Sequence, residues 1–178
     1  MDLVREGLIE PYEARRRLSG IDLTEVSRTR FDTHAADLLG RAQAASIGVA
    51  SGVVALDSEA AERMAQRGEV VILARRDIAT SDINGIASAA GILTASGSRT
   101  SHAAVVARQL GKVCVVGCAG LEVDMAKRRC KIGGRTVNEG DDLSLDGNEG
   151  CVYSGKLDVV IERPERELKA VEEWGAVG

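Results

Sequence analysis

One histidine stands where its side chain can do chemistry, at the start of a predicted helix. His102 is one of only two histidines in the 178 residues, and it follows a loop of small and hydroxyl-bearing residues that contains Gly97, Thr100 and Ser101. Thr100 or Ser101 can cap a helix whose apolar residues continue to a stop at Gly111. His102 is therefore predicted to lie in the first turn of that helix.

The beginning of a helix favours an anion. Its first amide groups have no partners within the helix, and the macrodipole places partial positive charge there. A phosphoryl group on His102 would be held by these amides, and the same field favours a neutral, nucleophilic imidazole. Arg99 and Arg108 can add charge-assisted hydrogen bonds to phosphoryl oxygens. This arrangement is typical of a histidine that carries phosphate.

Short strands and helices are predicted around this helix. The sequence favours strands over 49–56, 70–74 and 92–94, and an apolar strand between Cys114 and Cys118. It favours helices over 10–18, 58–66 and 81–90. From Lys131 to Tyr153, glycine and acidic turns separate short alternating strands, with a hairpin signal at Asp146-Gly147. Many strands and few helices predict an α+β sandwich of short strands.

The histidine loop and its helix resemble the signature of the enzymes that use phosphoenolpyruvate through a swivelling phosphohistidine domain. The residues that fit the signature are Gly97, Thr100, Ser101, His102, Ala103, Ala104, Val105, Val106, Ala107 and Arg108. Ser98 departs from the usual glycine or alanine. The chain is most similar to the pyruvate, phosphate dikinases, although Arg99 is similar to the phosphoenolpyruvate synthases and sugar-transport enzyme I.

This resemblance covers nearly the whole chain and implies three segments. The expected domain is a β/β/α swivelling domain over 41–160, and within it Ile47 stands where the family usually has proline. A helical linker-like segment is expected over 1–40, and a linker-like helix over 161–178. With 178 residues the chain can bury one sizeable core.

The resemblance also implies a relay in which His102 is the catalytic residue. His102 would accept a phosphoryl group from ATP at a nucleotide-binding domain and deliver it to pyruvate at a barrel domain that binds phosphoenolpyruvate. No cofactor or metal is expected in this chain, and Mg²⁺ with ATP or phosphoenolpyruvate is expected on partner domains carried by other chains. Dikinases have a regulatory threonine two residues before the histidine, which makes Thr100 a candidate for reversible phosphorylation.

The chain is not expected to turn over substrates alone. A helix terminus contributes about 0.3 to 2 kcal/mol, whereas enzymatic acceleration requires at least about 8 kcal/mol. Positioning of the substrates and neutralisation of their charge must therefore come from partners.

Composition argues against several other classes of protein. A net charge of −4, with one Phe, two Tyr and one Trp, predicts no nucleic-acid surface. No apolar run is long enough to span a bilayer and the Met-Asp start is unlike a signal peptide, so a cytoplasmic protein is expected. The cysteines are spaced irregularly, which predicts buried thiols and no metal site; they are Cys114, Cys118, Cys130 and Cys151.

Other interpretations of these residues stay open. His102 can be an ordinary helix-start histidine, Thr100 and Ser101 can be caps alone, and Arg108 can be a cation near the last carbonyls of its helix. Ser98 and Ile47 leave room for a non-catalytic docking or regulatory module with the same fold. Arg99 leaves room for a relay of the synthase or sugar-transport kind. The donor that phosphorylates His102 would separate the relays.

Overall fold

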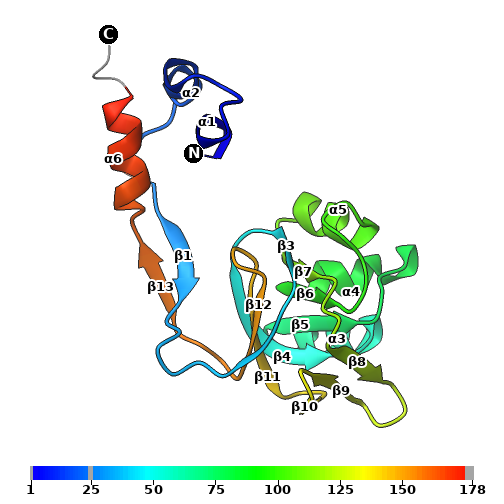
Figure 1. The fold of residues 1–178 in the computed structure, drawn as a ribbon. Coiled ribbons are helices and arrows are strands. Elements are labelled where there is room, and N and C mark those ends of the chain that lie inside the picture. The colour runs from blue at the N-terminus through cyan, green and yellow to red at the C-terminus, as the bar shows by residue number, and fades with distance from the viewer. Residues whose placement is uncertain (1, 24–25, 175–178) are drawn as a thin grey trace. The chain divides into compact units, whose positions relative to one another are not determined.

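The computed structural model describes residues 2–23 and 26–174 (Figure 1). These residues form two compact units. The larger unit spans Thr29–Val160, and the smaller unit combines the described residues up to Arg28 with those from Ile161 onward. The predicted helix that carries His102 lies in the larger unit.

An eight-stranded sheet forms the centre of the larger unit. Its strands, in spatial order, are β2 (Leu38–Arg41), β12 (Cys151–Ser154), β11 (Asp142–Asp146), β4 (Val49–Ala55), β5 (Val71–Arg75), β6 (Gly91–Thr94), β7 (Val113–Val116) and β3 (Gln43–Ser46). The four strands from β4 to β7 run parallel, and the neighbours on either side pair antiparallel. β5, β6 and β7 are apolar at nearly every position because both of their faces are covered.

Helices connect the parallel strands and cover one face of this sheet. They are α3 (Ser58–Gln66), α4 (Ile83–Ser88), which follows a short 3₁₀ turn over Thr80–Asp82, and α5 (His102–Gln109). Their small apolar residues pack with β5, β6 and β7 in one buried cluster. Gly85 lets α4 approach α3 closely, because a Cβ there would lie 2.7 Å from the Cα of Ser58.

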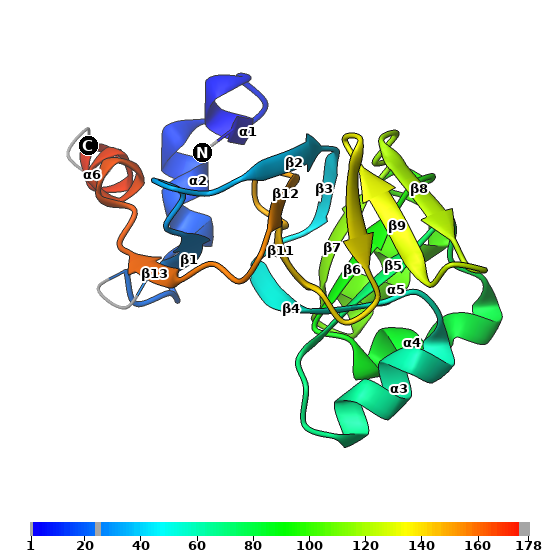
Figure 2. The same ribbon diagram turned by 90° about the horizontal axis from the view of Figure 1, so that it is seen from below.

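A small antiparallel sheet covers the opposite face. It consists of β8 (Leu121–Asp124), β9 (Arg129–Ile132) and β10 (Arg135–Asn138). Leu121, Cys130 and Ile132 pack with the large sheet in a second buried cluster. Figure 2 shows the small sheet and the helices on opposite sides of the large sheet. The predicted β/β/α sandwich is thus confirmed.

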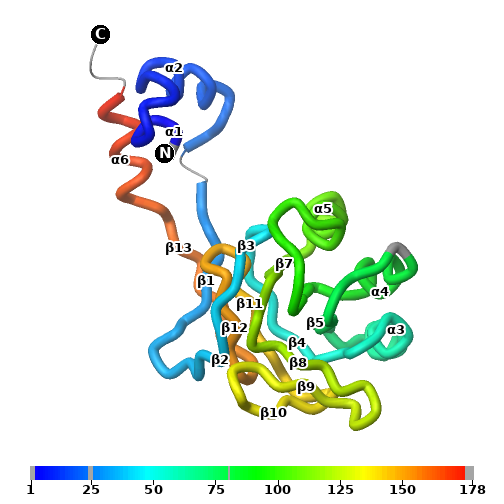
Figure 3. The backbone as a smooth tube through the Cα atoms, turned by 45° about the vertical axis from the view of Figure 1, so that its right-hand side comes forward, coloured from blue at the N-terminus to red at the C-terminus, as the bar shows by residue number. Residues whose placement is uncertain are grey.

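The smaller unit brings together residues from both ends of the sequence, as the tube in Figure 3 traces. Its helices are α1 (Asp2–Arg5), α2 (Pro11–Arg17) and α6 (Glu165–Glu173). Nη1 of Arg15 donates to the carbonyls of Val171 and Glu172, each at 3.2 Å. Two further strands, β1 (Arg28–Phe31) and β13 (Val159–Glu162), pair with each other in a separate sheet, and each of them has residues in both units.

The structure differs from the sequence-based boundaries in two places. Residues 29–40, expected within a helical linker, belong to the larger unit and contribute to β1 and β2. These strands are short and pair with strands more than a hundred residues away, so local pattern does not reveal them. The helix expected over 81–90 is shorter because the Asp82 carboxylate accepts from the amide of Ala79 at 2.9 Å and holds a tight turn before it.

Candidate functional site

The carboxyl ends of the parallel strands lie at one edge of the large sheet. The loop after β6 and the start of α5 lie at this edge, together with the residues that follow β4, β5 and β7. Ligands of open α/β sheets bind beyond the carboxyl ends of their strands. The topology therefore places His102 at the edge where a ligand is expected.

The start of α5 has the geometry that the sequence predicts. The helix begins at His102, and Ser101 is its N-cap, with Oγ accepting from the amide of Ala104 at 3.4 Å. Ala103, Ala104 and Ala107 are buried against the sheet, whereas the His102 side chain is exposed. The apolar face of the helix thus holds it on the core, while the imidazole stays accessible to solvent.

Hydrogen bonds from neighbouring strand ends hold the loop before α5 in place. The buried Thr94 hydroxyl donates to the carbonyl of Ser96 at 2.6 Å. Ser96 in turn donates to the carbonyl of Arg76 through its amide at 3.0 Å and its hydroxyl at 2.9 Å. These supporting residues were not predicted from the sequence. They lie at or just after the ends of predicted buried strands, and this position is the signal that could have found them.

Gly97 gives this loop its turn. Its φ of +101° lies in the left-handed region, which L side chains rarely adopt. A Cβ at this position would lie 3.1 Å from Oγ of Ser101, the capping atom of α5. Gly117, after β7, is also close, because a Cβ there would lie 2.9 Å from the carbonyl of Gly97. The predicted role of Gly97 in the loop is therefore a conformational one.

The two hydroxyl-bearing residues before the cap bond to each other. Oγ of Ser98 lies 3.0 Å from Oγ1 of Thr100 and accepts from the amide of Thr100 at 3.4 Å. The amide of Ser101 donates to the carbonyl of Ser98 at 2.9 Å, which closes a turn. Of the two predicted caps, Ser101 has this role and Thr100 does not. Ser98, which stands where the signature usually has glycine or alanine, therefore adds hydrogen bonds to the loop.

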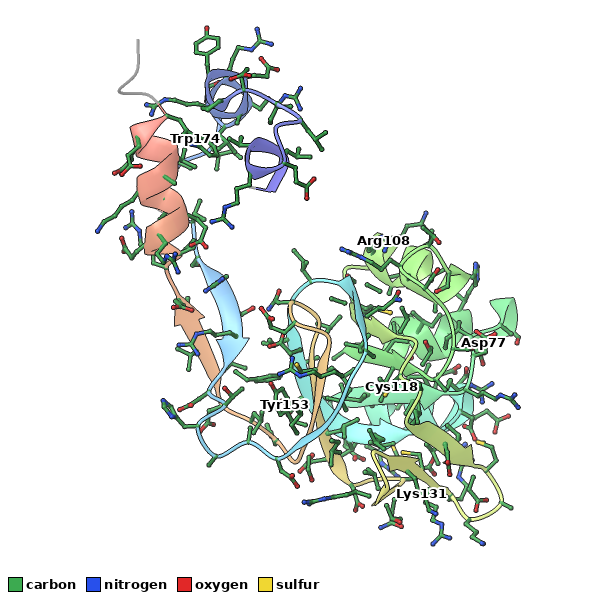
Figure 4. All side chains as sticks on the ribbon, viewed as in Figure 1. Asp77, Arg108, Cys118, Lys131, Tyr153 and Trp174 are labelled. Atoms are coloured by element: carbon green, nitrogen blue, oxygen red, sulfur yellow. The ribbon has the colours of Figure 1, made fainter. Side chains whose placement is uncertain are left out.

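Arg108 supports the loop before α5 through two hydrogen bonds. Its Nη1 donates to the carbonyl of Ala45 on β3 at 2.7 Å and to the carbonyl of Arg99 at 2.9 Å. Figure 4 labels Arg108 on α5, near β3. These acceptors belong to the loop and the edge strand, and neither is a last carbonyl of α5, the alternative that the sequence allowed. The structure thus gives Arg108 a supporting role, and its contact with a phosphoryl group stays a prediction.

Arg99 has a different environment. Its side chain is exposed and makes no ion pair or hydrogen bond with any residue in the described part of the chain. The guanidinium therefore remains available to an anion. Within the described residues the structure brings Gly97, Arg99, Thr100, Ser101, His102 and Arg108 together around one loop and one helix.

The cysteines and acidic residues offer no alternative centre in the described ranges. All four thiols are buried and free, as predicted. Burial raises the pKa of Cys114 to about 12 and that of Cys130 to about 11. Residues 2–23 and 26–174 contain no group of three or more His, Cys, Asp or Glu side chains that could hold a metal ion. Nor does any helix in these ranges have the length and apolar character to cross a membrane.

Comparison with known proteins gives one family and a set of relatives. Residues 68–150 match the family "PEP-utilising enzyme, mobile domain". The chain is 42% identical over 166 residues to pyruvate, phosphate dikinase of Entamoeba histolytica, a match that covers 93% of this chain and 18% of that protein. It is 39% identical over 160 residues to pyruvate, phosphate dikinase of Clostridium symbiosum, covering 88% and 18%.

A solved structure of an Enzyme I protein, determined by NMR, is also similar. The two share 29% sequence identity with a TM-score of 0.33, over 60% of this chain and 35% of that chain. The chain spans about a fifth of the length of the curated relatives it matches, and 18% of each of the two dikinases above.

Proposed function

Residues 68–150 belong to the mobile-domain family of PEP-utilising enzymes, and from this premise we propose that the chain carries a phosphoryl group on His102 between two sites on partner domains. The predicted resemblance to the dikinases is confirmed by identities of 34% to 42% over most of the chain. The chain therefore contains a phosphotransfer domain of this family. The histidine and the relay are the further proposal.

The position of His102 is the observation that supports this proposal. It is the first residue of α5, it is exposed, and the cap at Ser101 orders the helix terminus behind it. A phosphoryl group on its imidazole would lie close to the unpaired amides and partial positive charge of the helix terminus. Arg99 adds an exposed guanidinium three residues earlier.

The partners are proposed from the part of the relatives that lies outside the matched segment. Because the matched segment is 18% of each dikinase, most of those proteins lies outside it. We expect one partner domain to bind ATP and another to bind pyruvate or phosphoenolpyruvate, each with Mg²⁺. His102 accepts the phosphoryl group at one domain and donates it at the other, and the chain alone does not turn over substrate.

Intact mass spectrometry at alkaline pH tests the carrier role. The chain is incubated with ATP or phosphoenolpyruvate in an extract of its source cells, beside His102→Asn and the matched control His34→Asn. His34 is the other histidine and is exposed. We expect an acid-labile gain of one phosphoryl group in the wild type and in His34→Asn but not in His102→Asn. No gain with either donor would instead favour a docking or regulatory module.

Regulation at Thr100 is the second part of the proposal. Thr100 is exposed, and its hydroxyl lies 3.0 Å from that of Ser98 on the turn before His102. A phosphate on Thr100 would add about 1.5 to 2 negative charges beside the imidazole and disfavour a second phosphoryl group there. Phosphopeptide mapping of protein from its source cells tests this idea, which fails if no acid-stable phosphate is found on Thr100 under any growth condition.

A further inference from the structure

A hollow of about 600 Å³ lies beside the loop that presents His102. Its lining includes Ala45, Ile47, Arg99, Arg108, Gly111 and Asn148. We propose that this hollow is a docking site for an acidic segment of a partner protein, with Ile47 as the apolar contact. This inference rests on the proposed function, because only a relay requires a partner to bind next to the histidine.

The hollow is built on an ordered framework. β3 is the last strand of the large sheet, so no other strand in the described part of the chain covers its outer edge. Arg108 joins this edge to the histidine loop through its bonds to Ala45 and Arg99. Nδ2 of Asn148 donates to the carbonyl of Thr29 at 3.1 Å, and its Oδ1 accepts from the amide of Gly48 at the same distance. A partner would therefore meet a surface that is largely preformed.

The charge of the hollow points to carboxylates. Among the residues that the structure describes, its lining includes two arginines and no acidic side chain. Arg108 donates to neutral carbonyls, and neither Arg108 nor Arg99 forms a salt bridge with any described residue. The whole chain carries a net charge of −4, so this positive surface runs against its overall charge. Complementary charge across an interface speeds encounter and selects the partner.

The exposed apolar residues indicate a protein rather than a small anion. Ile47 is 83% exposed at the rim of the hollow, and Leu110, beside the lining residue Gly111, is 43% exposed. A phosphate ion would leave both side chains in water. A protein segment that pairs an acidic residue with an apolar one covers the isoleucine while its carboxylate reaches Arg99.

Two residues that line the hollow are close to His102 in the structure of the loop and helix. Arg99 lies three residues before His102, and Arg108 belongs to the same helix as His102. A partner seated on the hollow therefore has its neighbouring surface at the start of α5. Docking would raise the effective concentration of the imidazole at the partner's phosphoryl site without contributing to the chemistry.

Phosphorylation kinetics with the purified donor enzyme from the source cells test the docking site. The labelling rate of His102 is measured against donor concentration for the wild type, Ile47→Asp and Arg99→Glu. We expect each variant to raise the concentration for half-maximal labelling by about tenfold or more. In Ile47→Asp the maximal rate should change less than about twofold, whereas Arg99→Glu should also lower it, because Arg99 is proposed to contact the phosphoryl group. Added salt should raise that concentration for the wild type and have less effect on Arg99→Glu.

Neither of the two matched controls changes a residue that lines the hollow. Lys131→Glu reverses an exposed charge at the opposite end of the larger unit from Arg108 in Figure 4, and Ile161→Asp alters another exposed isoleucine, at 72% exposure. Both controls should label like the wild type. Circular dichroism on every variant verifies folding, and Ile47→Ala replaces Ile47→Asp if that variant unfolds.

Each other outcome has a distinct meaning. Unchanged half-maximal concentrations in Ile47→Asp and Arg99→Glu would overturn the docking site while leaving the carrier function intact, and so would a lower maximal rate of Ile47→Asp without a change in its half-maximal concentration. A small-anion site would instead be indicated by two results together. The NMR signals of Arg99 would shift saturably on titration with millimolar inorganic phosphate, and Ile47→Asp would have no effect on labelling. A wild type that is never labelled would overturn the proposed function and this inference together.

Discussion

Arg108 donates a hydrogen bond of 2.9 Å from Nη1 to the main-chain carbonyl of Arg99. The same nitrogen donates to the carbonyl of Ala45 at 2.7 Å, so one guanidinium links the histidine loop, α5 and the edge strand β3. The carbonyl of Arg99 lies in the turn between Gly97 and the cap at Ser101. The position of the loop before His102 therefore depends on a side chain that lies near the end of the same helix.

Removing this guanidinium should loosen the loop. We expect Arg108→Met to lower the free energy of unfolding by about 1 to 2 kcal/mol, because two carbonyls lose a charged donor. Arg108→Lys should lose less stability than Arg108→Met, since lysine keeps the positive charge. Denaturant unfolding measures the stability, and hydrogen exchange of residues 98–101 measures the loop. Arg63→Met on α3 removes an exposed ion pair with Glu59 and an attraction to Asp57, so it should change the free energy of unfolding by less than about 0.5 kcal/mol and leave the exchange of residues 98–101 unchanged. Unchanged exchange in Arg108→Met would contradict the supporting role.

A methyl group at Gly97 should disturb the start of α5. Its φ is +101°, and the added Cβ would lie 3.1 Å from Oγ and 3.2 Å from Cβ of the capping Ser101. We expect Gly97→Ala to lower the free energy of unfolding by about 2 kcal/mol, through backbone strain and a weakened cap, and to slow phosphorylation of His102. Thermal unfolding and mass-based labelling measure the two effects.

Gly68 offers a control for the backbone strain alone. It also has a positive φ, of +85°, but an added Cβ would have no atom within 4 Å. Gly68→Ala should therefore cost about 1 kcal/mol and leave labelling unchanged. Equal losses of labelling in the two variants would show that Gly97 has no special relation to the cap.

The start of α5 could be predicted from sequence because its determinants are local. A capping serine, the histidine, a run of small apolar residues and a terminal glycine lie within about eleven positions, and the structure begins the helix at His102 as expected. The same holds for α3, which runs from Ser58 to Gln66 as predicted. In both helices the signal and the structure occupy the same short segment.

The rest of the fold and of the candidate site depends on contacts between segments that are distant in the sequence. The carbonyl of Ala45 lies 63 positions before Arg108, and no spacing rule links the two. β2, with the sequence LLGR, has no alternation of apolar residues and exists because β12 pairs with it. The hollow beside Ile47 likewise combines segments around 45, 99 and 147, which only the assembled sheet brings together.

The buried thiols should be inert in the folded protein. Burial raises the pKa of Cys114 to about 12, so at pH 8 about one such thiol in ten thousand is ionised. We expect no alkylation of any of the four cysteines by iodoacetamide at pH 8 under native conditions, and complete alkylation in guanidinium chloride. Intact mass gives the number of adducts. Rapid native modification of Cys114 would show that the helix face of the sheet opens.

An ionic network at the start of α3 gives the fold a defined acid sensitivity. Arg128 has a positive φ of 46° and donates to the carboxylates of both Asp57 and Glu139. Asp57 also caps α3, with Oδ1 accepting from the amide of Ala60 at 2.7 Å. Burial pushes the pKa of Asp57 upward, but the hydrogen bonds from Arg128 and Ala60 outweigh it and hold this pKa below 3.8.

Replacing Asp57 separates its charge from its cap. Because the folded pKa lies below the ordinary value of 3.8, the carboxylate stabilises the fold fully above that value, and this stabilisation is lost as pH falls through the folded pKa. Asp57→Asn should therefore be less stable than the wild type near pH 7, with the difference shrinking below about pH 4. At both pH 7 and pH 3, the free energy of unfolding of Asp57→Ala should be about 1 kcal/mol lower than that of Asp57→Asn, since alanine also lacks the cap. Urea unfolding at pH 7 and pH 3 measures these differences, and a constant gap between wild type and Asp57→Asn would show that the ionised carboxylate does not stabilise the fold.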